Sequence, residues 1–309
     1  MKTDSPRITV IIPVRNGSAG IAALVRAVRA QGDPDALEIV VVDDGSTDGT
    51  DRCAKDAGAR VLRLADSPGN PAVARNHGAK EARGDWLAFI DADCMPDDRW
   101  LAALVRRAEE GYEVVGGSLG MPPGLAWSAR LDYIVSSYHT HPKRPPGLVP
   151  NHSPANLFVR RDLFLGTSMF EEKHPAAYAH EELIWQGEVL RSGGRIFFEP
   201  AARVDHENRP GLLNVFKRNY RWGYSAVYSK AKTGAARAPG LYRFPIVPAL
   251  LAVPAAPLIA LYIMYCWLRA GEWEIVPMAP FLLGARFAHG AGSFVGYFRG
   301  GSERRPGWE

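Results

Sequence analysis

The chain begins with alternating blocks of apolar and polar residues whose lengths suit strands and helices. Short apolar runs rich in valine and isoleucine predict buried strands at 8–12, 37–42, 60–64 and 86–90. Between them, the patterning predicts helices near 21–28, 48–58 and 71–83. Strands that alternate with helices are typical of parallel β-α-β units, so the pattern predicts an α/β fold.

Polar or conformationally restricted residues follow three of these predicted strands. In open α/β sheets, ligands bind beyond the carboxyl ends of the strands, so we expect these residues to meet in one crevice. The Asp-x-Asp cluster among them can hold a hard divalent cation that bridges to nucleotide phosphates, although such short motifs alone are often solvated turns. The residues are Pro13, Asp43, Asp44, Asp91, Ala92 and Asp93.

The end of the chain is more hydrophobic. Residues 246–268 carry no charge over a length that could cross a bilayer core, although prolines at the start argue against a straight helix. A second apolar stretch, 276–298, contains Arg286, which is costly at mid-bilayer, so this stretch either spans or lies at the interface. We expect a membrane-associated hairpin with both flanks in the cytoplasm, because basic residues precede and follow it. A buried hairpin of a soluble protein is the alternative.

Between these regions, residues 212–232 mix aromatic and basic side chains in a helical pattern. Such a helix suits the membrane interface, and an ordinary surface helix is the alternative. The chain is therefore predicted to divide into a catalytic domain at 1–210, an interfacial region at 211–243 and a membrane-associated segment at 244–309.

Charge, cysteine and histidine content exclude some classes of function but do not identify one. Lys+Arg 37 against Asp+Glu 33 gives a net charge of +4, which carries no nucleic-acid signature. The three cysteines lie far apart and predict neither a disulfide framework nor a metal motif, so a reducing compartment is favoured. The apolar run near the start is interrupted by Pro13, so we expect no signal peptide. His139, His141 and His152 lack an acidic or cysteine partner, and a substrate-facing loop is favoured there over a zinc site.

Several motifs, in this order along the chain, resemble family-2 glycosyltransferases of the GT-A fold. They are the segments 8–16, 39–50, 74–78, 91–93 and 156–162, and the similarity covers about residues 6–230. The resemblance implies a Rossmann-like, mostly parallel sheet flanked by helices. It also implies a nucleotide-diphosphate sugar as donor, a divalent metal (Mn²⁺ or Mg²⁺) and inversion at the anomeric carbon.

The resemblance also suggests roles for individual residues on the donor side. A base pocket would be shaped by Pro13, Val14 and Arg15, with Asp43 or Asp44 accepting from a base N–H. Arg75 offers a cationic fork for phosphate or for orienting the acidic cluster. By the same resemblance, Asp91 and Ala92 are expected beside the ribose, and Asp93 and Asp91 are expected to bind the metal. His206 is expected as a third metal ligand, and its imidazole suits manganese better than magnesium.

An inverting transfer needs a general base opposite the leaving group. This chain has Glu181-Glu182 where the family usually has Glu-Asp, so Glu182 is the expected base and Glu181 the alternative. Acidic residues also stabilise a helix N-terminus by about 0.3–1 kcal/mol, which would explain them without catalysis.

The acceptor side is expected to include Asn156, Arg221 and Trp222. Processive members carry Gln-x-x-Arg-Trp, and here Arg218 replaces the glutamine, so addition of a single sugar to a lipid-linked or membrane-proximal acceptor is favoured. Two alternatives stay open: a nucleotidyltransferase, which usually has a glycine-rich, lysine-bearing loop that this chain lacks after its first strand, and a non-catalytic sugar-nucleotide binder.

Overall fold

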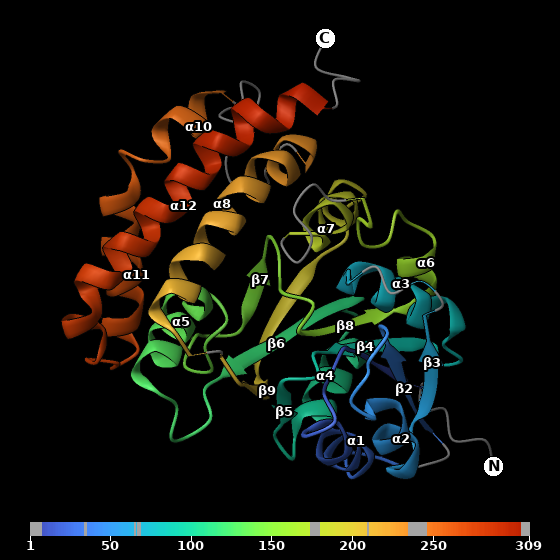
Figure 1. Ribbon diagram of the computed structural model, residues 1–309. Coiled ribbons are helices and arrows are strands. Elements are labelled where there is room, and N and C mark those ends of the chain that lie inside the picture. Colours follow the sequence, from blue (N-terminus) through green and yellow to red (C-terminus); the bar gives the residue numbers. More distant parts are fainter. Residues whose placement is uncertain are drawn as a thin grey trace. The chain divides into compact units, whose positions relative to one another are not determined.

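The computed structural model describes residues 8–33, 36–64, 66, 69–173, 180–208, 210–233 and 246–303. The chain forms two compact units (Figure 1). The first contains Met1–Pro122, Thr140–Glu172 and Glu188–His206, and the second contains Pro123–His139, Lys173–Gly187 and Glu207–Glu309. The predicted division at 210 and 243 stays a prediction.

The first unit is built on a sheet that, over the described residues, has the order β3-β2-β1-β4-β8-β6-β9-β5, with β7 beside β9. Its strands β1, β2, β3 and β4 are parallel neighbours, while β8 runs antiparallel to both β4 and β6. The strands are β1 Ile8–Val14, β2 Leu37–Asp43, β3 Arg60–Arg63, β4 Trp86–Ile90, β5 Cys94–Pro96, β6 Val114–Gly120, β7 Gly147–Val149, β8 Asn156–Arg160 and β9 Ile196–His206. The α/β class is confirmed, but the sheet is mixed and the prediction that it is mostly parallel was wrong. Strand direction in the second half depends on pairing between distant segments, which apolar runs do not reveal.

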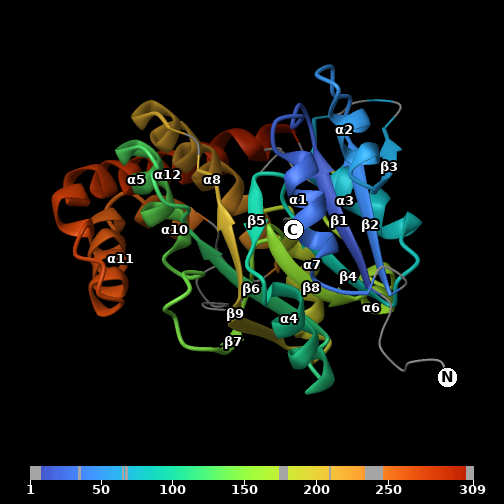
Figure 2. The same ribbon diagram turned by 90° about the horizontal axis from the view of Figure 1, so that it is seen from below.

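Helices cover both faces of this sheet, as continuous apolar strands require (Figure 2). Val10 and Ile12 share a core cluster with Leu24 of α1 and Leu104 of α4. Ile11, which alternates with them, faces Gly78 of α3, where an added Cβ would meet its side chain at 2.7 Å. The helices are α1 Ile21–Arg29, α2 Thr50–Asp56, α3 Pro71–Glu81, α4 Trp100–Glu109 and α6 Arg161–Leu165. The predicted strands and helices of the first ninety residues are therefore confirmed.

The centre of the sheet depends on two adjacent glycines in β6. A Cβ at Gly117 would collide with the carbonyl oxygen of Ala202 and the side-chain amide of Asn156, and one at Gly116 would collide with the His152 ring. Both glycines therefore leave room for buried polar groups that cross from neighbouring segments.

We expect Gly117→Ala to lower the free energy of unfolding by roughly 1–3 kcal/mol, because the added methyl overfills this contact. Urea unfolding measures the change. Gly20→Ala is the matched control, since a Cβ at Gly20 meets nothing within 4 Å and should change stability by less than about 0.5 kcal/mol. Equal stability of the two variants would contradict the close packing at Gly117.

The second unit is helical. Its elements are α5 Trp127–Ser137, the first part of α7 (Glu182–Arg191), α8 Leu212–Thr233, α10 Ile246–Leu251, α11 Ala256–Arg269 and α12 Ile275–Glu303. Helices α8 and α12 lie side by side, and a Cβ at Gly223 or Gly292 would collide with the backbone of the other helix. The Ser293 hydroxyl donates to the Gly223 carbonyl at 3.1 Å. Small residues thus let these two helices approach closely.

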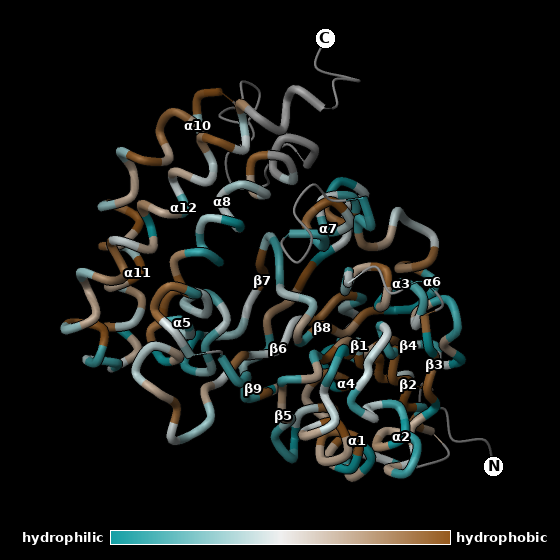
Figure 3. Tube along the Cα trace, viewed as in Figure 1, coloured by the Kyte–Doolittle hydropathy of each residue, from teal (hydrophilic) through white to brown (hydrophobic). Residues whose placement is uncertain are grey.

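The predicted membrane-spanning hairpin is not supported. The uncharged run 246–268 is divided between α10 and α11, and Figure 3 shows both with many hydrophobic residues. Pro254 and Pro257 interrupt the run because proline donates no backbone hydrogen bond and clashes with the preceding turn. Across the part of the chain that the structure describes, no helix combines the length and the hydrophobicity needed to cross a bilayer.

The charged Arg286 within 276–298 lies inside the second unit. Arg286 of α12 is buried and donates to the Asn219 side chain of α8, and burial lowers its pKa to about 10. The helix predicted over 212–232 is present as α8, and its position at a membrane interface stays a prediction. The rest of that region, 234–245, and the basic tail at 304–309 lie outside the described residues.

Candidate active site

The carboxyl ends of the neighbouring parallel strands β2, β1 and β4 meet at one edge of the sheet. Val14 pairs with Asp43 in the parallel register of β1 and β2, and the Asp44 amide donates to the Val14 carbonyl at 2.9 Å. β4 lies on the other side of β1 and ends at Ile90, directly before Asp91. Asp43 and Asp44 are buried, Pro13 is half-buried and Arg15 is exposed. The predicted gathering of strand ends is therefore present in the first unit.

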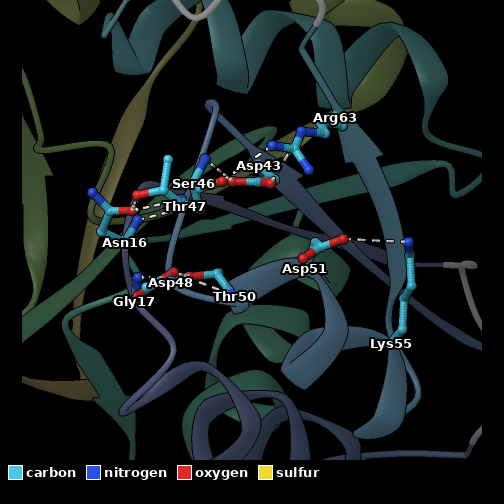
Figure 4. Close-up of polar contacts among 10 residues, drawn as sticks. All are labelled: Asn16, Gly17, Asp43, Ser46, Thr47, Asp48, Thr50, Asp51, Lys55 and Arg63. Carbon is cyan, nitrogen blue, oxygen red and sulfur yellow. Dashed lines mark hydrogen bonds and ion pairs between the residues drawn. The ribbon is translucent and has the colours of Figure 1, made fainter.

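Side-chain hydrogen bonds join the loop after β2 to the loop after β1 (Figure 4). The backbone N–H of Asn16 donates to the Ser46 hydroxyl at 2.8 Å, and the backbone N–H of Gly17 donates to the Thr50 hydroxyl at 2.9 Å. Asp43 Oδ1 accepts from the Ser46 amide at 2.9 Å. Asn16, Ser46 and Thr50 were not predicted as positioning residues; the Ser/Thr/Asp-rich turn was the available signal.

The second carboxylate oxygen of Asp43 faces Arg63, whose guanidinium also donates to the Ser46 carbonyl at 3.1 Å. It lies 3.9 Å from Arg63 Nε, is buried, and accepts no hydrogen bond among the described residues (Figure 4). A buried carboxylate oxygen of this kind suits an N–H donor such as that of a nucleobase.

Arg75 and Asp91 form a close ion pair. Arg75 of α3 is buried and its Nη2 donates to Asp91 Oδ1 at 2.5 Å. The Cys94 amide donates to the Asp91 carbonyl at 3.0 Å, which closes a turn over Ala92 and Asp93. This ion pair agrees with one of the two predicted roles of Arg75, orienting the acidic cluster, which stays a prediction.

Beyond that turn, three potential metal ligands converge. Cys94 and His206 are directly opposite in the antiparallel register of β5 and β9, which places their side chains on one face. Asp93 Oδ1 lies 3.5 Å from His206 Nε2, and ligand atoms of Asp93, Cys94 and His206 all lie within 4.8 Å of one another. This donor set fits a divalent cation.

The cluster differs from the predicted set in two members. Asp91 lies outside it among the described residues, because its carboxylate is turned to Arg75, so its predicted role as a direct ligand is not favoured. Cys94 was missed, since only the pairing of β5 with β9 brings it beside His206. Burial, with the Asp93 and Asp91 carboxylates, raises the pKa of the Cys94 thiol well above its ordinary value.

Asn156 has a different position from the one predicted. Its side chain is fully buried, accepts from the Trp100 indole at 2.8 Å, and donates to the carbonyls of Ser118 at 2.9 Å and Ala202 at 2.8 Å. An acceptor could reach this amide only if one of those bonds broke. Asn156 therefore ties β8 to its neighbours, and a direct contact with an acceptor is not favoured.

The remaining predicted residues belong to the second unit. Glu181 and Glu182 are both buried, and Glu182 begins α7. The preceding His180 is fixed by α8, because its Nδ1 lies 2.7 Å from the Ser225 hydroxyl. On the same helix, Arg221 is exposed and Trp222 is half-buried with the Arg218 guanidinium 5.5 Å from its ring. The roles of these residues as base and acceptor contacts stay predictions.

The histidines of the proline-rich segment form no metal cluster among the described residues. His152 is buried, and its Nδ1 lies 3.0 Å from the Ser153 carbonyl oxygen. Burial lowers its pKa to about 4 from an ordinary value of 6.5. His152 is thus a neutral core residue at physiological pH.

This lowered pKa predicts a loss of stability in acid. Between pH 6.5 and 4 the unfolded chain binds a proton at His152 that the folded chain excludes, so stability falls as the pH falls. From pH 7 to 5 we expect a loss of roughly 2 kcal/mol from this group, measured by urea unfolding. His152→Gln should flatten this slope, and His77→Gln on α3 should leave it. An unchanged slope in His152→Gln would show that another group is responsible.

Comparisons with known proteins agree with this geometry. A family model described as Glycosyl transferase family 2 matches residues 9–165. A pre-mycofactocin glycosyltransferase of Mycobacterium tuberculosis is 28% identical over 228 residues, covering 71% of this chain and 46% of the relative, so the chain spans about half of that protein's length. Glycosyltransferase AglE of Haloferax volcanii is 31% identical over 231 residues, covering 72% of this chain and 74% of the relative.

A relative matched over a shorter stretch and a solved structure extend the comparison. An undecaprenyl-phosphate 4-deoxy-4-formamido-L-arabinose transferase of Aeromonas hydrophila is 34% identical over 121 residues, covering 37% of each chain. Mannosyltransferase PcManGT from Pyrobaculum calidifontis, solved with GDP-Man and Mn²⁺, has a TM-score of 0.59 at 20% identity and covers 92% of this chain and 86% of its own. This structural likeness supports the GT-A-like fold. From the family match and the similarity to AglE, the chain belongs to glycosyl transferase family 2.

Proposed function

We propose that this enzyme transfers a single sugar, with inversion and with the help of a divalent metal, from a nucleotide-diphosphate sugar to a lipid-linked or membrane-proximal acceptor. One observation carries the proposal. The carboxyl ends of parallel strands β2, β1 and β4 meet at one edge and lead into Asp44, Arg15 and Asp91, the place where open α/β sheets bind nucleotides.

The residues at this edge have different roles in binding the nucleotide sugar. Pro13, Val14 and Arg15 flank the base, and the buried Asp43, with Asp44 beside it, accepts from a base N–H. The Arg75–Asp91 ion pair holds the turn at 91–94, so that Asp91 and Ala92 face the ribose.

Asp93 and His206 would hold Mn²⁺ or Mg²⁺, and the bound cation would offset the charge that develops on the leaving diphosphate. The protein's own contribution is to orient the ligands: the turn fixes Asp93 and strand pairing fixes His206. Glu182, or Glu181 in its place, takes the proton of the acceptor hydroxyl as that oxygen attacks the anomeric carbon.

We place the enzyme at the cytoplasmic membrane surface. Four apolar or aromatic side chains of α11 are more than half exposed, and they are Leu258, Leu261, Tyr262 and Tyr265. Exposed apolar groups on one helix suit burial at a lipid interface. This proposed location, together with the undecaprenyl phosphate in the name of the Aeromonas relative, supports a lipid-linked or membrane-proximal acceptor.

A panel of nucleotide sugars tests the donor. The correct donor, with Mn²⁺, raises the melting temperature because it binds only the folded state. Incubation with a lipid-linked acceptor should then release a nucleoside diphosphate. Release of pyrophosphate from a nucleoside triphosphate would identify a nucleotidyltransferase, and stabilisation without any turnover would identify a sugar-nucleotide binder.

Flotation with anionic lipid vesicles tests the location. The double substitution Leu258→Glu, Leu261→Glu should weaken vesicle binding by at least roughly 10-fold, because it removes two apolar contacts and adds two charges facing lipid. Leu148→Glu, at a residue of β7 that is 60% exposed, is the matched control and should float like the wild type. Wild-type protein that stays at the bottom of the gradient would contradict the proposed location.

A further inference from the structure

The cation site contains a donor that the proposed reaction does not use. Cys94 is 3% exposed, and its sulfur belongs to the same three-donor group as the Asp93 carboxylate and the His206 imidazole. Its place follows from the backbone: β5 and β9 are antiparallel, and Cys94 is directly opposite His206. The sulfur is therefore held toward the imidazole by strand pairing and not by a mobile loop.

A sulfur ligand changes which metals a site prefers. A carboxylate alone suits Mg²⁺ and Mn²⁺, whereas a thiolate with an imidazole suits Zn²⁺ and Co²⁺, which also stand above Mn²⁺ in the general order of affinities. Asp93, Cys94 and His206 offer one hard, one soft and one borderline donor. Three protein ligands with a further open position are the arrangement found in many zinc sites.

We propose that Cys94 is a ligand at this site and increases its preference for Zn²⁺ over Mn²⁺, so that Zn²⁺ displaces the activating ion. As the sulfur–metal bond forms, the thiol releases its proton to solvent. The inference rests on the proposed cation site at Asp93 and His206. It adds a preference for Zn²⁺ over Mn²⁺ that is larger than the one a carboxylate–imidazole pair alone would produce.

Cobalt is the probe because a cobalt–thiolate bond produces a charge-transfer band in the near ultraviolet. Titration of Co²⁺ into the reduced full chain should produce this band, and Cys94→Ser should abolish it. Competition with a chromophoric chelator should show at least a roughly 10-fold loss of Zn²⁺ affinity in Cys94→Ser, with Mn²⁺ affinity changed far less. Cys53→Ser, at a half-buried cysteine of α2, is the matched control and should keep the band.

If Cys94→Ser does not fold, His206→Gln tests the site with the thiol intact. In this variant the cobalt charge-transfer band should weaken and the Zn²⁺ affinity should fall. No charge-transfer band in the wild type, or a band lost in Cys53→Ser, would overturn the inference. If Mn²⁺ binds but the Co²⁺ titration shows no thiolate band, only the role of Cys94 is overturned. If none of Mn²⁺, Co²⁺ and Zn²⁺ binds, the proposed cation site itself is overturned.

Discussion

Asp93→Asn should lower kcat/KM for nucleoside diphosphate release roughly 100-fold at a fixed Mn²⁺ concentration. The substitution removes the negative charge of the carboxylate that faces His206 Nε2 at 3.5 Å, while keeping the size of the side chain. Because the cation acts on charge that develops during transfer, weaker cation binding should reduce the rate more than donor binding. Steady-state release measured against Mn²⁺ concentration separates the two effects.

Asp98→Asn is the matched control for this substitution. Asp98 is an exposed aspartate on the segment that follows β5, and its replacement makes the same change of charge. It should retain wild-type turnover and wild-type dependence on Mn²⁺. Full activity of Asp93→Asn would exclude Asp93 as a ligand for the activating ion.

Glu182→Gln should lower kcat about 10²–10⁴-fold, the usual contribution of a general base, with little change in affinity for the nucleotide sugar. The amide cannot take the proton of the acceptor hydroxyl, although it fills nearly the same space at the start of α7. Single-turnover release with a saturating acceptor measures the chemical step directly.

Glu181→Gln is the paired test, because the two carboxylates are adjacent and both buried. If Glu181→Gln loses the activity and Glu182→Gln keeps it, the base is Glu181. If both variants turn over like the wild type, neither residue is the base. Donor-induced stabilisation should persist in both variants, which distinguishes lost chemistry from lost folding.

The first half of the fold could be predicted because its signals are local. The strands β1, β2 and β4 are continuous apolar runs, and α1 places Ile21, Leu24, Val25 and Val28 on one buried face. The sheet edge at Asp43 and Asp91 follows from parallel pairing of those strands. For such elements the pattern of side chains and the tertiary packing agree.

The second half could not be predicted in the same way. β6 contains three glycines within Val114–Gly120, so it lacks an apolar run, and β5 and β7 are too short to show any period. The position of Cys94 depends on a pairing with β9 that is distant in sequence. The uncharged run near the end of the chain misled for a related reason: hydropathy records the absence of charge, whereas Pro254 and Pro257 decide where helices begin and end.

The loops after β1 and β2 are already fixed to each other in the free protein by bonds from Asn16 and Gly17 to Ser46 and Thr50. A nucleotide-sugar donor that binds at these two loops meets a backbone that already lost its conformational entropy during folding. The cost of ordering the loops therefore lowers the affinity for the donor only a little. Substitutions at Ser46 or Thr50 would therefore act indirectly. They would loosen the two loops and weaken the affinity for the nucleotide-sugar donor without removing any contact to it.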